Sequence, residues 1–232
     1  MPTANFIPFT SGTNVAQVSY YSGVQTSWNA ARSATTAASY ANSGSGNKDA
    51  ATYYLGAGRT QNYAIGRIQT WFDLSSLSTT TITAMDLKIK SGTSSGASIS
   101  VVAVASNAFG NLTNATITTA DYNNLNPSTT FSSAVSWPNA ASAGSTVIFS
   151  MNAAAVSAAN TNNKFGCALI TSAWDQPNTD PTGGFSFDLW GAVDWKYRFD
   201  LLVTYTSSSG YAHNVNAVGP SNIGSINGVP TA

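Results

Sequence analysis

Glutamate is absent from this chain of 232 residues, and charged residues of all kinds make up only 8% of it. Nine basic and nine acidic residues balance to a net charge of zero with histidine neutral. A nucleic-acid binder needs a basic face for phosphates, and an electrostatic membrane anchor needs a run of lysine or arginine. No stretch is long and apolar enough for a transmembrane helix. The sequence therefore predicts neither a nucleic-acid partner nor membrane insertion.

Cysteine and histidine occur once each, as Cys167 and His213. A lone cysteine excludes a disulfide within the chain. Because Cys167 stands in an apolar strand pattern, we interpret it as a small buried hydrophobe and not as a nucleophile. His213 has no second histidine with which to share a metal or complete a catalytic triad. These absences predict a protein that is not an enzyme and has no histidine-based metal site.

The first nine residues contain no basic region and no long apolar run. They therefore lack the features of a secretory signal peptide. We expect synthesis in the cytoplasm, with any role outside the cell reached by lysis, by a non-classical route or inside a particle.

The clearest pattern that is present lies in residues 67–90, where side chains alternate along two segments. The first segment sets Ile68, Thr70, Phe72 and Leu74 on one face against Arg67, Gln69, Trp71 and Asp73 on the other. In the second segment, Met85, Leu87 and Ile89 form the apolar set. Such alternation is typical of strands with one buried face. We predict two antiparallel strands joined by a polar Ser/Thr loop.

A family resemblance is carried by the core positions of these segments: Phe72, Asp73, Leu74, Ser75, Leu77, Ile82, Ala84, Leu87 and Ile89. With a closing strand at residues 197–205, this pattern resembles the disaggregatase-related (DNRLRE) jelly-roll family over residues 50–206. The resemblance implies an all-β fold, a jelly-roll β-sandwich of two antiparallel sheets. Taken alone, it also implies a glycan-binding module that acts in adhesion to a cell surface.

Composition divides the chain into three parts. Residues 1–13 form an extended N-terminal arm, residues 14–206 the sandwich, and residues 207–232 a Ser/Gly linker followed by an uncharged C-terminal tail. Within the sandwich, residues 97–105 are apolar on both faces, which predicts a strand covered on both sides. Residues 152–160 predict a short helix with Asn152 as its N-cap.

Aromatic and acidic residues gather towards the end of the sandwich. Trp174, Trp190 and Trp195 could stack on sugar rings, or they could fill the core. Loop carboxylates such as Asp175 and Asp180 could hold a structural calcium, although their spacing is unlike that of an EF-hand. A glycosidase pair among Asp175, Asp180, Asp188, Asp194 and Asp200 lacks supporting residues. We predict no catalytic residues and no cofactor.

Trp71 and the tail are the predicted partner-binding elements. Trp71 alternates with buried Phe72, so it is expected on the outer face, where a large ring often marks a contact. The tail contributes spaced side chains: Tyr211, Val215, Val218, Ile223, Ile226 and Val229. Its Ile-Asn-Gly-Val run resembles segments at the ends of phage structural proteins. A segment of this kind suits addition to a neighbouring sheet.

These features together predict a non-enzymatic structural protein of a bacteriophage virion. Capsid decoration, head fibre and tail accessory roles all fit, with anchoring through the extended termini. The expected partners are other capsid or tail subunits and further copies of the chain, with a host surface glycan as an additional possibility. The alternative is the glycan-binding module.

Overall fold

The computed structural model describes residues 1–7, 15–21, 27–35, 40–42, 49–57, 60–95, 99–113, 115–138, 144–181, 184–189, 199–207, 225–226 and 229–230. The first strands are β1 (Thr3–Phe6), β2 (Val15–Tyr21), β3 (Tyr40–Asn42), β4 (Asp49–Ala57), β5 (Thr60–Asp73), β6 (Thr80–Ser95), β7 (Ser100–Ser106) and β8 (Leu125–Thr130). They are followed by β9 (Val135–Ser136), β10 (Thr146–Ser150), β11 (Lys164–Thr171), β12 (Gly184–Leu189), β13 (Phe199–Ser207), β14 (Ser225–Ile226) and β15 (Val229–Pro230). Short helical segments are α1 (Trp28–Arg32), η1 (Ser75–Leu77), α2 (Ala108–Leu112), η2 (Thr119–Asn123) and α3 (Ala153–Asn162). Among the helices of these residues, none is long and apolar enough to cross a membrane.

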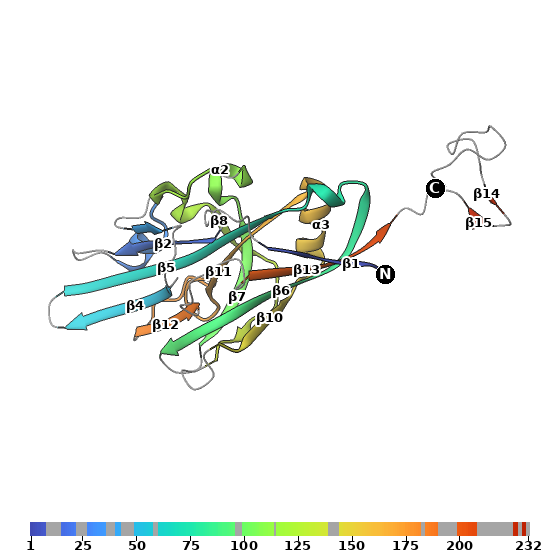
Figure 1. The fold of residues 1–232 in the computed structure, drawn as a ribbon. Helices are drawn as coiled ribbons and strands as arrows, with labels where there is room; N and C mark the ends of the chain where they lie inside the picture. Colours follow the sequence, from blue (N-terminus) through green and yellow to red (C-terminus); the bar gives the residue numbers. More distant parts are fainter. Residues whose placement is uncertain are drawn as a thin grey trace.

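Two antiparallel sheets make up the body (Figure 1). One sheet has the order β1–β13–β6–β10. The other has the order β2–β5–β11–β7, with β8 and β9 along the far side of β7. Eight strands can be numbered in chain order: β1, β5, β6, β7, β8, β10, β11 and β13. The first, eighth, third and sixth of them then lie side by side in one sheet, and the second, seventh, fourth and fifth lie side by side in the other. This is the strand order of a jelly roll. The predicted β-sandwich is therefore confirmed.

The two strands predicted within residues 67–90 exist, but they do not pair with each other. β5 hydrogen-bonds to β2, β4 and β11, whereas β6 hydrogen-bonds to β10, β12 and β13. The η1 connection therefore carries the chain across the sandwich from one sheet to the other. The prediction of an adjacent pair was wrong, although the inward-facing residues were assigned correctly.

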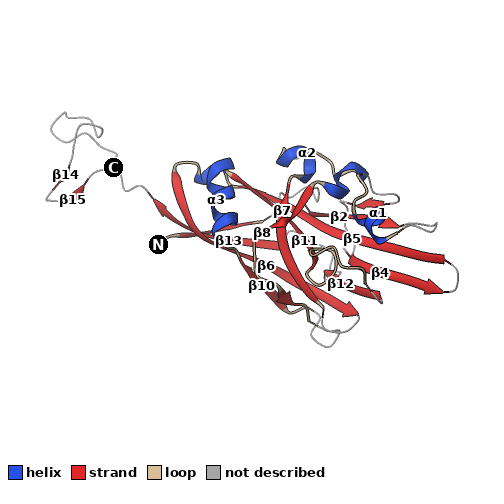
Figure 2. Ribbon diagram, turned by 180° about the vertical axis from the view of Figure 1, so that it is seen from behind, coloured by secondary structure: helices blue, strands red, loops and turns tan. Residues whose placement is uncertain are grey.

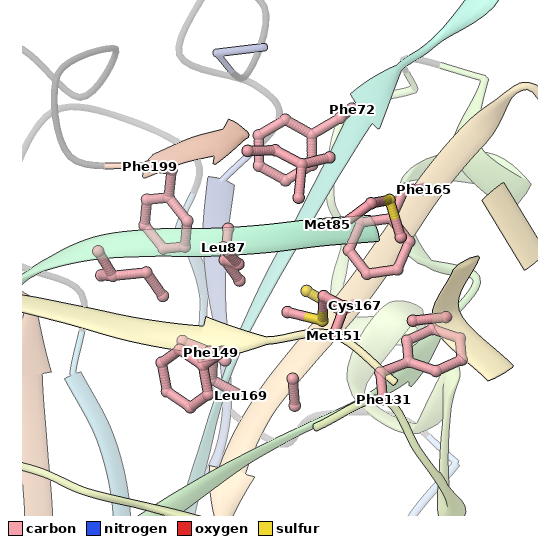
Figure 3. Packing of buried hydrophobic residues seen from close by; sticks show 14 of the residues in the cluster. Phe72, Met85, Leu87, Phe131, Phe149, Met151, Phe165, Cys167, Leu169 and Phe199 are labelled. Carbon is pink, nitrogen blue, oxygen red and sulfur yellow. The ribbon is translucent and has the colours of Figure 1, made fainter. Parts of the chain in front are cut away.

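The main core lies between the sheets and contains the inward sets of both segments (Figure 3). Ile68, Phe72, Leu87 and Ile89 are completely buried there. Phe165 of β11 stacks near Phe72, with ring centroids 6.5 Å apart. Burial of this apolar surface is the main stabilising term of the body.

The N-terminal arm belongs in part to the sandwich. β1, inside the predicted arm, pairs along β13, with Phe6 opposite Leu201. Phe6 also packs against the main core. Thr3–Phe6 therefore forms an edge strand of the first sheet and not a free extension.

The predicted short helix exists as α3, and it packs at one end of the sandwich (Figure 1). The side chain of Asn152 accepts a hydrogen bond from the Ala155 amide at 3.1 Å, which makes it the N-cap. Ala155 and Ala159 face the core and are fully buried. Because a helix this short is marginal alone, its packing against β6 and β11 is what stabilises it.

Cys167 lies inside β11 and shares the main core with Leu169, as predicted. Burial raises the pKa of its thiol to about 12, so the reactive thiolate is scarce at neutral pH. We expect a thiol reagent to label Cys167 only after denaturation, measured by mass spectrometry with and without urea. Rapid labelling of the native protein would contradict this placement.

Candidate functional site

The outer face of the sheet that contains β2, β5, β11 and β7 is covered by other parts of the same chain. α1, α2 and η2 pack against β5, β11 and β2 (Figure 2). A second cluster of large rings fills this layer, each at most 5% exposed: Trp28, Tyr63, Trp71, Phe109 and Tyr122. Antiparallel sheets commonly leave one face to solvent. In this protein that face is buried under the covering segments and forms a second hydrophobic core.

A buried ion pair stands in the middle of this second core. Arg67 of β5 is fully buried, and its Nε and Nη2 atoms donate to the two carboxylate oxygens of Asp175, both at 2.9 Å. The remaining guanidinium nitrogen donates to the Tyr122 carbonyl at 2.9 Å. The Tyr122 ring lies beneath the guanidinium carbon, 4.2 Å from its centroid. This geometry combines a bidentate pair with a cation–π contact.

Arg32 of α1 extends the ion pair towards the surface. Its Nε atom donates to the Asp175 carbonyl at 2.7 Å and lies 3.3 Å from the carboxylate. Arg67 in turn donates to the Arg32 carbonyl at 3.1 Å. Burial alone would lower the pKa of Arg67, but the charge of Asp175 and the Tyr122 phenol outweigh this effect and raise the pKa above its ordinary value. Arg67 therefore stays charged, and its contacts tie three distant segments together.

Gln69, the next residue on the outward face of β5, hydrogen-bonds to a further segment of the chain, η2. Its amide nitrogen donates to the Asp121 carbonyl at 2.6 Å, and its amide oxygen accepts from the Ser106 hydroxyl. The Asp121 carboxylate accepts from the Thr118 amide at 2.8 Å and completes the capping box of η2. Such a network rigidifies a site when its members are satisfied. Both residues of the Arg67–Asp175 ion pair are buried, which leaves no side open to a substrate. We therefore interpret the role of the pair as structural.

α2 is a left-handed turn. Four consecutive residues have positive φ: Phe109 at 61°, Gly110 at 63°, Asn111 at 60° and Leu112 at 59°. For residues other than glycine, this conformation costs about 1–2 kcal/mol each. Phe109 and Leu112 are buried in the second core, which offsets the strain. Strain of this kind is concentrated at functional sites.

Gly166 of β11 makes room for the left-handed turn. A Cβ atom at this position would lie 2.5 Å from the Leu112 side chain and 2.7 Å from the Ser106 carbonyl oxygen. Any larger residue would therefore push the turn away from the sheet.

Two small hollows lie near the start of α2, and both are lined by Asn107, which precedes this segment. The first, about 230 Å³, lies over Ala105 and Leu125 and is rimmed by four asparagines: Asn107, Asn123, Asn124 and Asn126. The second, about 250 Å³, shares Ala105 and Asn107 and reaches Lys164. Amide side chains both donate and accept hydrogen bonds without carrying charge. We name the first hollow the amide hollow; its chemistry suits a neutral, hydroxyl-rich group such as a sugar ring.

Trp71 does lie on the opposite face from Phe72, but the prediction of an exposed ring was wrong. The ring is only 5% exposed because the second core covers it. It therefore presents no contact surface to a partner in this conformation.

The predicted glycan-binding tryptophans are not brought together within the described residues. Trp174 is half-buried and packs against the second core. Trp190 and Trp195 lie outside the described residues. An aromatic sugar platform is therefore not visible in the part of the chain that the structure describes.

The loop carboxylates have protein partners. Both oxygens of Asp175 are held by Arg67, and the Asp180 carboxylate accepts from the Tyr63 hydroxyl at 2.8 and 2.9 Å. Among the described residues, no three His, Cys, Asp or Glu side chains lie where they could hold a metal ion together. Asp175 is therefore an unsuitable calcium ligand, because cationic groups already surround it. Asp194 lies outside the described residues.

The predicted tail residues Tyr211, Val215, Val218 and Ile223 lie outside the described residues, as does His213. Ile226 and Val229 pair with each other in the two-stranded sheet β14–β15, which is drawn clear of the sandwich in Figure 1. The intervening Asn-Gly is the strongest two-residue hairpin signal. Within the described part of the tail, Ser225–Ile226 and Val229–Pro230 therefore form two short antiparallel strands, and the predicted addition to a neighbouring sheet stays a prediction.

Sequence reasoning missed Arg67, which the structure places at the centre of the second core. A signal was present: the same face of β5 also carries Tyr63, Ile65 and Trp71. Large apolar residues on both sides of a lone arginine indicate that the face is covered.

No family model matches the chain, and no curated protein matches it.

Proposed function

We propose that this chain is a non-enzymatic structural protein of a bacteriophage particle, anchored through the segment that follows the sandwich. Capsid decoration, head fibre and tail accessory positions remain open. The observation that carries the proposal is that the jelly roll is complete at Ser207, where β13 ends. Residues 208–232 are not needed to close either sheet, and their only described strands pair with each other.

Further support comes from the body and from the tail sequence. In the part of the chain that the structure describes, both sides of the sheet that contains β5, β11 and β7 are covered by the chain's own core residues. Residues 208–232 contain no Asp, Glu, Lys or Arg, and they resemble terminal segments of phage structural proteins. A segment without charge and with spaced Val and Ile residues is suited to packing in a groove of another subunit.

Deleting residues 211–232 tests the proposal. The melting temperature of the body is expected to remain nearly unchanged, because the sandwich is closed without the tail. Incorporation into particles is expected to be lost, measured as copy number in purified virions against wild type. Asn216→Ala, a polar change within the tail, serves as the control and should incorporate normally.

Two outcomes of this deletion would contradict the proposal in different ways. Full occupancy of the truncated protein would show that the tail is not the anchor. Unfolding of the truncated body would show that the tail is part of the fold.

The glycan-binding module remains the second candidate, and the amide hollow is the observation that favours it. Its neutral rim and a volume of about 230 Å³ match a single sugar unit more closely than a charged ligand. Retention of the truncated body on immobilised glycans, with loss in Asn107→Ala, would distinguish this candidate from a purely structural role.

A further inference from the structure

We draw no further inference here: the strongest candidate, the outer edge of β1 at the margin of the sheet β1–β13–β6–β10, has no second strand beside it among the described residues, and nothing in the structure shows what covers it.

Discussion

Arg67→Met is expected to lower the free energy of unfolding by about 3–5 kcal/mol, the usual loss when one partner of a buried ion pair is removed. Asp175 would remain buried with only Arg32 beside it, at 3.3 Å. The carbonyls of Tyr122 and Arg32 would also lose a donor. Unfolding in urea, followed by tryptophan fluorescence, measures the loss.

Two matched variants separate the charge from the geometry. Arg67→Lys keeps the charge but cannot form the two parallel hydrogen bonds to Asp175, so we expect an intermediate loss. Arg67→Met combined with Asp175→Leu removes both charges and is expected to recover much of the stability lost in Arg67→Met. A double variant less stable than Arg67→Met would show that the pair is not the source of the effect.

The sequence allowed the inward faces of the main core to be predicted. Alternation in β5 and β6 identified Ile68, Phe72, Leu87 and Ile89, and all four are fully buried. The apolar character of β7 on both faces likewise predicted its double coverage: Val101 lies in the main core, and Val102 lies on the outer side. These predictions succeed because strand geometry places alternate side chains on opposite faces whatever the fold.

Strand pairing could not be predicted in the same way. A polar connection of a few residues fits both a hairpin and a crossing between sheets, and alternation is identical in the two cases. The decision depends on which strands β5 and β6 meet elsewhere, such as β11 and β13. Those partners are distant in sequence, so local patterns carry no information about them.

The second core was missed for a related reason. Asp175 is separated from Arg67 by 108 residues, and neither residue has a distinctive local pattern. The left-handed turn at residues 109–112 was equally hidden, because Gly110 is its only glycine. Its other residues adopt positive φ only because Phe109 and Leu112 gain buried contacts there. Tertiary packing thus decides a local conformation that propensity alone opposes.

Trp71→Ala is expected to destabilise the protein about as much as Phe72→Ala, roughly 3–5 kcal/mol each. The two rings lie on opposite faces of β5, at 5% and 0% exposure, so each fills a core. Trp71→Phe is the matched control: it keeps a ring but removes the indole nitrogen, a buried atom with no hydrogen-bond partner in the described residues. We expect it to cost much less than Trp71→Ala. A loss below about 1 kcal/mol for Trp71→Ala, in the range typical of surface changes, would show that the covering segments leave this face in solution. Trp71 would then be available to a partner after all.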